Sequence, residues 1–147
     1  MEVENLVCQY LSCLRSLALI HQNNHWQVSG VNFYGAHLLF GRIYDEVTKD
    51  IDAAAEEFIG LFGADSVNLN KQMPMINNYC DRWAQENLKM NEGIKRFLFS
   101  SWQAEKEFQE LSESTYKQLK ESEDMTLGLD DLIMATHRAS ESRKYLL

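Results

Sequence analysis

Apolar residues recur every three or four positions along most of the chain, which predicts an all-helical protein. The first such stretch runs from about residue 3 to 28, and the second runs from Phe33 to near Gly63. Residues 29–32 lie between them and supply serine, glycine and asparagine, which favour a turn. Because this connection is short, the two helices are expected to form an antiparallel hairpin.

The rest of the chain predicts two more helices after a long connection. Residues 64–82 hold the only proline and no sustained apolar period, so we expect a connection with room for one short helix. A third helix is expected from Trp83 to about residue 121, and a fourth begins near Thr126. Short, long and short connections predict a ferritin-like four-helix bundle with one long crossover between helices two and three.

Composition and charge narrow the class of protein. One proline and seven glycines argue against a sheet protein full of tight turns, and residues 1–147 are expected to form a single domain. A formal net charge of −8 disfavours nucleic acid as a partner, because phosphate binding needs clustered lysine and arginine. The apolar run at residues 6–20 is too short and too polar to span a bilayer, so no membrane association is expected.

The first residues and the cysteines predict a cytoplasmic protein. No basic residue precedes Arg15, so neither a secretory leader nor a basic DNA-binding arm is expected there. Cys8, Cys13 and Cys80 are odd in number and lack the CxxC spacing, which favours a reducing compartment. We interpret them as small core residues.

Two pairs of potential metal ligands occur in the first hairpin. His25 and His37 lie at similar separations before and after the turn, so an antiparallel hairpin places them side by side. Asp52 and Glu56 are four residues apart, which puts both carboxylates on one helix face. Fifteen residues separate His37 from Asp52, which is about 22 Å along a helix, whereas metal–ligand bonds measure about 2.0–2.2 Å. One chain therefore cannot close both pairs around one ion.

Two interpretations follow from this distance. The two pairs are unrelated, or a twofold axis brings the histidines of one subunit against the carboxylates of another, which would form two sites in each dimer. An intrasubunit di-iron centre would need Glu-x-x-His on two helices, and the sequence contains none. Such a centre is not expected.

Residues 21–63 resemble the Dps family of mini-ferritins. They contain His-Trp, a glycine and a phenylalanine at the turn, a second histidine, and then an aspartate and a glutamate one turn apart. The spacings from His25 to His37, Asp52 and Glu56 agree with the family pattern. The last helical segment resembles the family's last helix more weakly.

This resemblance implies an activity and an assembly. Dps subunits usually form shells of twelve, oxidise ferrous iron with peroxide or oxygen between twofold-related subunits, and store ferric mineral. It implies that His25 and His37 of one subunit bind iron with Asp52 and Glu56 of its neighbour, and that Trp26 packs near the site. We therefore expect a homo-oligomeric ferroxidase that protects against oxidative damage, with zinc as a possible substitute for iron.

The chain departs from the family pattern at informative positions. Gly41 stands where the family usually has an aspartate, so one carboxylate is missing and the weaker of two iron positions should suffer most. Asp45 could substitute through a water, although Asp45, Glu46 and Asp50 also read as a solvated helix face. Glu57 stands where the family usually has arginine. The lysine-rich DNA-binding tail of many members is absent, so DNA is not expected as a partner.

Several residues and functions have a second interpretation. His21 lies four residues before His25 and could join a metal, but a surface or interface role is expected for it, and His137 is expected to be structural. Asp130 and Asp131 resemble the region that lines the family's threefold pores and guides ferrous ions, or they are simply charges at a helix N-terminus. Because of Gly41, a structural shell protein with a degenerate metal site and little turnover is the main alternative. A zinc-binding helical dimer is a third.

Overall fold

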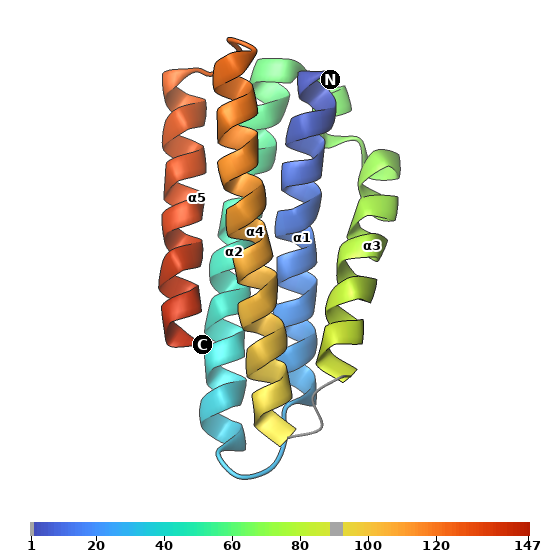
Figure 1. Cartoon of the computed structure of the whole chain (residues 1–147), viewed down its shortest axis with the longest axis vertical. Helices are drawn as coiled ribbons and strands as arrows, with labels where there is room; N and C mark the ends of the chain where they lie inside the picture. Colours follow the sequence, from blue (N-terminus) through green and yellow to red (C-terminus); the bar gives the residue numbers. More distant parts are fainter. Residues whose placement is uncertain (1, 89–92) are drawn as a thin grey trace.

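The computed structural model describes residues 2–88 and 93–147, and this part of the chain is helical without strands. Its elements are α1 (Val3–Gln27), α2 (Phe33–Phe62), the 3-10 helix η1 (Ala64–Val67), α3 (Leu69–Leu88), α4 (Gly93–Glu121) and α5 (Leu127–Leu146). Helices α1, α2, α4 and α5 form a four-helix bundle, and α3 runs down one side of it (Figure 1). The predicted all-α, ferritin-like bundle with one long crossover is confirmed.

The first two helices and the start of the last one agree with the prediction. Gly30 and Asn32 adopt positive φ angles of 97° and 66° in the turn between α1 and α2, a region that these two residue types tolerate best. Gly63 ends α2 with a φ of 87°. Thr126 caps α5 by accepting a hydrogen bond of 3.1 Å from the backbone N–H of Leu129.

The prediction for the crossover was wrong about its helix content. α3 is a helix of 20 residues, and it continues past Trp83, where the third bundle helix was expected to begin. That bundle helix is instead α4, which begins at Gly93. Met90, which the apolar pattern assigned to the third helix, lies outside the described residues.

Helix α3 was not predicted, because a polar residue on its buried face interrupts the apolar pattern. Gln72, Ile76 and Trp83 are buried at helical spacing. The amide of Gln72 accepts a hydrogen bond of 2.7 Å from Arg15 and donates one of 2.8 Å to the backbone carbonyl of Val67. These partners replace the water that a buried amide would otherwise need.

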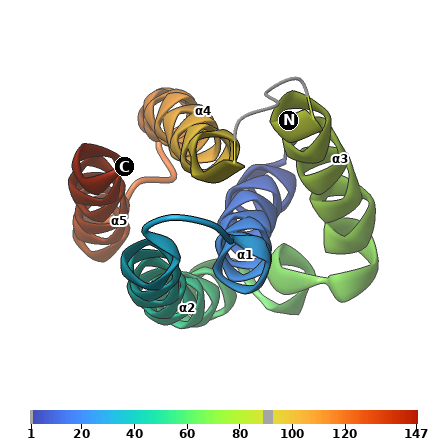
Figure 2. The ribbon, with the colours of Figure 1, turned by 90° about the horizontal axis from the view of Figure 1, so that it is seen from below.

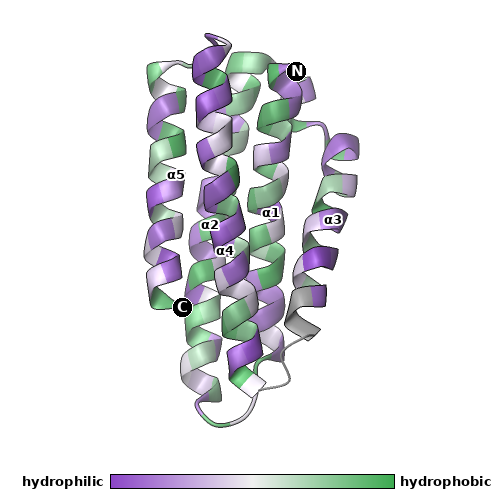
Figure 3. Ribbon diagram, viewed as in Figure 1, coloured by the Kyte–Doolittle hydropathy of each residue, from purple (hydrophilic) through white to green (hydrophobic). Residues whose placement is uncertain are grey.

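The helices pack around a core that is centred on α1, which lies between α2, α3 and α4 (Figure 2). The ring of Tyr10 packs edge-on against Phe58 and Phe108, with centroid distances of 5.9 and 5.2 Å. Hydrophilic residues predominate on the outer side of α4 (Figure 3). Among the described residues, no helix is long and apolar enough to cross a membrane.

Candidate metal-binding site

The first hairpin brings His25 of α1 beside His37 of α2, as the spacing predicts. The ring centroids lie 3.8 Å apart and the ring planes differ by 17°. The Nδ1 atom of His25 lies 2.6 Å from the backbone oxygen of His37, and the Nδ1 atom of His37 lies 2.7 Å from the backbone oxygen of His25. Because a carbonyl oxygen only accepts, we assign a hydrogen to each Nδ1, which leaves both Nε2 lone pairs available to a metal ion.

The end of α1 explains part of this arrangement. The carbonyl of His25 lies in the last turn of α1, where helix carbonyls lack intrahelical partners. The imidazole of His37 supplies the missing donor, and the ring of Phe33 also stacks on that imidazole, with ring centroids 5.2 Å apart. The hairpin therefore fixes both the tautomer and the orientation of His37.

The stacking constrains how the two imidazoles can bind metal. A ring nitrogen binds a metal in the plane of its ring, so nearly parallel rings direct their lone pairs along separate lines. The pair can serve two neighbouring ions, which in two-metal sites lie about 3.5–4 Å apart. A single ion bound by both imidazoles would require one ring to rotate.

Asp52 and Glu56 are both exposed, one turn apart on α2, and further along this helix than His37. Within residues 2–88 and 93–147, no three His, Cys, Asp or Glu side chains are placed to hold a metal ion. A single chain thus does not assemble the four predicted ligands, which agrees with their separation along α2. The assignment of these four residues as ligands of one shared site stays a prediction.

Gly41 lies directly against the ring of His25. A Cβ atom at residue 41 would lie 3.0 Å from Cε1 and 3.1 Å from Nδ1 of His25. Any side chain at this position therefore requires the ring to move. A pocket of about 370 Å³ lies beside the imidazole, and its lining includes Trp26, Leu38 and Asp45.

Trp26 borders this pocket and is 66% exposed in the single chain. Other large apolar side chains at the same end of the hairpin are also exposed, including Val31 at 85%, Tyr34 at 70% and Leu38 at 51%. A group of exposed apolar residues beside polar ones is typical of a surface that binds another protein. This surface adjoins the paired histidines.

The centre of the bundle contains a charged cluster that the sequence analysis missed. The carboxylate of Glu105 on α4 accepts hydrogen bonds of 2.7 and 3.1 Å from Arg143, of 2.7 Å from Ser140 and of 2.7 Å from His21. All four residues are fully buried. Three helices therefore meet at one carboxylate, whose acceptor capacity is filled by these four hydrogen bonds.

This cluster corrects two expectations. His21, expected at the surface or an interface, is fully buried, and its Nδ1 atom lies 3.0 Å from the hydroxyl of Ser101. Asp50, expected on a solvated face, lies 3.4 Å from the guanidinium of Arg143 and its side chain is only 23% exposed. Neither residue is free to act as a surface ligand.

The cluster also shifts pKa values. Burial alone would raise the pKa of Glu105, but the hydrogen bonds and positive charge from His21 and Arg143 lower the pKa to about 2. The pKa of Arg143 is raised, because Glu105 and Asp50 outweigh the effect of burial. Burial raises the pKa of Asp50, and Arg143 offsets only part of that shift.

We expect acid to destabilise the folded chain through Glu105. Because the pKa of this carboxyl falls from 4.5 in the unfolded chain to about 2 in the folded one, its contribution is complete above about pH 4.5. That contribution is then lost as the pH falls through this window. The raised pKa of Asp50 acts in the opposite direction.

Urea unfolding at several pH values tests this prediction. The free energy of unfolding should fall between about pH 5 and pH 3, and this fall should be weaker in Glu105→Gln. An identical dependence in both proteins would show that Glu105 does not cause it.

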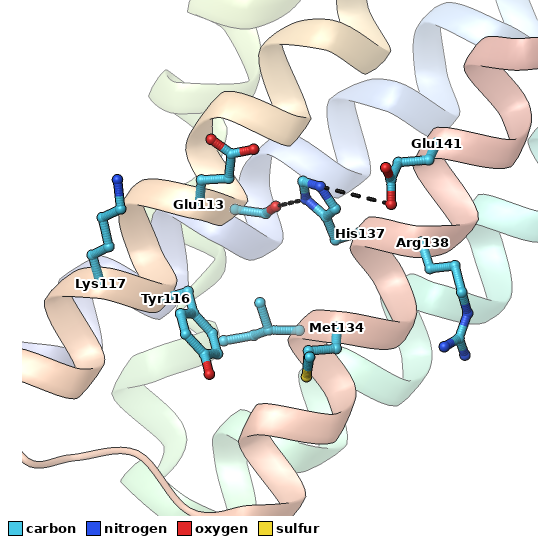
Figure 4. Close-up of a pocket in the computed structure, with 9 residues that line it drawn as sticks. Glu113, Tyr116, Lys117, Met134, His137, Arg138 and Glu141 are labelled. Carbon is cyan, nitrogen blue, oxygen red and sulfur yellow. Dashed lines mark hydrogen bonds and ion pairs between the residues drawn. The ribbon is translucent and has the colours of Figure 1, made fainter.

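His137 lies in a second pocket, of about 480 Å³, between α4 and α5 (Figure 4). Its Nδ1 atom contacts the hydroxyl of Ser112, and its Nε2 atom lies 4.0 Å from the carboxylate of Glu141. The contact with Ser112 links α5 to α4, whereas Glu141 lies on α5 itself, and both agree with the structural role expected of His137.

The two candidate pore carboxylates lie at the start of α5. Asp130 lies 3.3 Å from the hydroxyl of Tyr116 and 3.8 Å from the ammonium of Lys120. Asp131 is exposed. A pore between three subunits involves neighbouring chains, so the pore role of both residues stays a prediction.

The class of fold is that of the ferritin-like four-helix bundle with a crossover on one side. The chain is similar to the X-ray structure of Dps from Thermosynechococcus elongatus, with a TM-score of 0.76 and 17% identity over 98% of this chain and 86% of that one. It is also similar to a C-terminal deletion mutant of Mycobacterium smegmatis Dps, with a TM-score of 0.75 and 19% identity over 98% of this chain and 94% of that one. No protein-family model and no curated protein sequence matches the chain. The likeness establishes a Dps-like ferritin fold.

Proposed function

We propose that this protein is a mini-ferritin that binds ferrous iron at sites shared by two subunits, oxidises it with peroxide or oxygen, and stores the ferric product. The observation that carries this proposal is the pairing of His25 with His37, both with Nε2 available to a metal. Asp52 and Glu56 supply exposed carboxylates on the same hairpin, too far along α2 to reach these imidazoles. In a dimer with twofold symmetry, the carboxylates of one subunit would lie beside the imidazoles of the other.

The four donors suit the proposed substrate. Imidazole nitrogen and carboxylate oxygen together bind divalent iron, and the two carboxylates offset the charge of the cation. Each ferrous ion gives up one electron, so two ferrous ions and two protons convert one hydrogen peroxide to two waters. Consuming both reagents in this way would limit hydroxyl-radical formation and protect against oxidative damage.

The assembly is part of the same proposal. The exposed apolar residues beside the histidines support a subunit interface at this end of the hairpin, with Trp26 and Leu38 in contact with the neighbouring chain. An isologous dimer has two equivalent sites, and we propose a shell of such dimers, with twelve subunits as in the family that the sequence resembles. The three cysteines are free thiols, which supports a location in the cytoplasm.

The alternative to a ferroxidase is a structural shell protein with little turnover, and the glycine at position 41 favours it. Gly41 provides no carboxylate on the histidine side of the site, and the ring of His25 occupies the space that its side chain would need. Loss of an anionic ligand weakens binding of a hard cation. Zinc, which accepts the same donors, would give a third outcome without redox chemistry.

Two measurements test the proposal. Sedimentation should first show a stable oligomer, because a stable monomer cannot form the shared site. Oxidation of ferrous iron, followed by absorbance, should then fall by about 10- to 100-fold or more in His25→Ala and in Asp52→Ala, but not in the control His137→Ala. Metal binding without oxidation would favour the shell protein, and zinc that iron cannot displace would favour the zinc dimer.

A further inference from the structure

The last turns of α1 are tied to α4 by two buried polar side chains. α1 packs against both α2 and α4 (Figure 2), and Asn24 and His21 on α1 are fully buried. The amide nitrogen of Asn24 donates hydrogen bonds of 2.7 Å to the hydroxyl of Ser101 and of 3.3 Å to the backbone carbonyl of Phe97, both on α4. Because His25 directly follows Asn24, this constraint acts on the residue beside a proposed ligand.

The hydroxyl of Ser101 joins both of these side chains. It accepts from Asn24 and lies 3.0 Å from Nδ1 of His21. Nε2 of His21 lies 2.7 Å from the carboxylate of Glu105, which only accepts, so Nε2 carries a hydrogen. In the neutral imidazole Nδ1 is then an acceptor, and Ser101 donates to it. The hydrogen bonds therefore form one continuous chain from the amide of Asn24 to the carboxylate of Glu105.

This chain fixes the rotation of α1 about its own axis. Hydrogen bonds are directional, so two anchors one turn apart hold one face of the helix toward α4. The apolar contacts of Val28, which packs with Phe40 and Phe97 just beyond α1, are not directional and would tolerate rotation. Successive helical residues are about 100° apart, so with Asn24 directed at α4, His25 is directed toward α2.

The pairing of His25 with His37 is sensitive to this rotation. Their Nδ1 atoms lie 2.6 and 2.7 Å from each other's backbone oxygens, and both contacts require one rotational setting of α1. A helix with its side chains has a radius of about 5–6 Å, at which a rotation of about 10° moves an atom by about 1 Å. Such a shift breaks these hydrogen bonds and misplaces Nε2 of His25 relative to a metal ion.

We propose that Ser101 is a positioning residue of the metal-binding site, because its hydroxyl holds α1 at the rotation that directs His25 toward His37. This inference rests on the proposed function and extends the site to α4, a helix that contributes none of the four proposed ligands. Ser101 acts through Asn24 and His21 and does not itself bind the metal. Loss of a supporting hydrogen bond at a metal site typically lowers metal affinity by about 10- to 100-fold.

Two adjacent serines on α4 provide a matched test. Ser100 is also buried, but its hydroxyl has no hydrogen-bond partner among the described residues. Calorimetry and the visible absorption of Co²⁺ bound to the full-length assembled protein should show an affinity about 10-fold lower in Ser101→Ala, together with a changed absorption spectrum. Ser100→Ala, the same substitution one residue away, should leave the affinity and the spectrum as in wild type.

Asn24→Leu approaches the same chain from α1, and it decides the question should Ser101→Ala fail to assemble. Leucine keeps the approximate size of asparagine and donates no hydrogen bond, so Co²⁺ affinity should again fall by about 10-fold. The double variant Ser101→Ala with Asn24→Leu should lose little more, because both changes break one chain.

Wild-type Co²⁺ affinity and spectrum in Ser101→Ala would overturn the inference, even if its melting temperature falls. Losses that multiply to about 100-fold in the double variant would also overturn it, since the two residues would then act independently. Equal binding of Co²⁺ by wild type and His25→Ala would instead refute the proposed function.

Discussion

Replacement of Glu105 by alanine is expected to lower the free energy of unfolding by about 3–5 kcal/mol, because the guanidinium of Arg143 would remain buried without its main partner. In the folded chain this guanidinium is fully buried and makes two hydrogen bonds to Glu105. Asp50 would stay as a weaker partner at 3.4 Å. Small domains are stable by only about 5–15 kcal/mol, so the loss would be a large part of the total. Urea unfolding followed by circular dichroism measures it.

Two further variants separate the buried charge from a general effect of mutating α4. Glu113 is exposed on the same helix, so Glu113→Ala should change stability by no more than about 0.5 kcal/mol. The double variant Glu105→Leu with Arg143→Met removes both charges, and should be clearly more stable than Glu105→Ala. If Glu105→Ala lowers the free energy of unfolding no more than Glu113→Ala does, then the buried guanidinium of Arg143 does not need Glu105 as its partner.

The charged cluster also links the two halves of the proposed site. His21 precedes His25 by one turn on α1, and Asp50 precedes Asp52 by two residues on α2. Through Glu105 and Arg143, both helices are tied to α4 and α5. The cluster therefore holds α1 and α2 from inside the bundle, whereas His25 and His37 are half-buried and Asp52 and Glu56 are exposed.

The fold could be predicted where apolar periodicity and turn chemistry agreed. The turn at Gly30 and Asn32 and the cap at Thr126 depend on the local preferences of these residue types, so they can be predicted from the sequence alone. Helix α3 could not be predicted in this way, because Gln72 interrupts the apolar pattern of its buried face and Pro74 lies within the helix. The hydrogen bonds that make a buried Gln72 acceptable come from Arg15 and Val67, and only the folded chain brings these together.

The candidate site was predictable in its pairing and not in its detail. Counting from the turn places His25 opposite His37, but the reciprocal Nδ1 contacts depend on backbone carbonyls and on ring rotation. In the same way, Glu105 and Arg143 occur at core positions of their helices, as their spacing from Phe108 and Ser140 allows. Their pairing across 38 residues follows only from the way α4 and α5 pack.

A mixing experiment is expected to give the largest functional effect. Assembled His25→Ala and assembled Asp52→Ala proteins should each lose rapid oxidation of ferrous iron, because every shared site then lacks one ligand. When the two chains are refolded together, each mixed dimer contains one site with both defects and one site with all its ligands. Random pairing makes about half of the dimers mixed, so roughly a quarter of the wild-type sites should be complete.

The control for mixing is a pair of variants that damage the same half of the site. His25→Ala mixed with His37→Ala leaves one histidine missing from every site, so no activity should return. Recovery in the first mixture and none in the second requires imidazoles and carboxylates to come from different chains, since a site within one chain would stay broken in both mixtures. If the first mixture stays inactive although sedimentation shows mixed oligomers, the proposed sharing of ligands across the twofold axis is wrong.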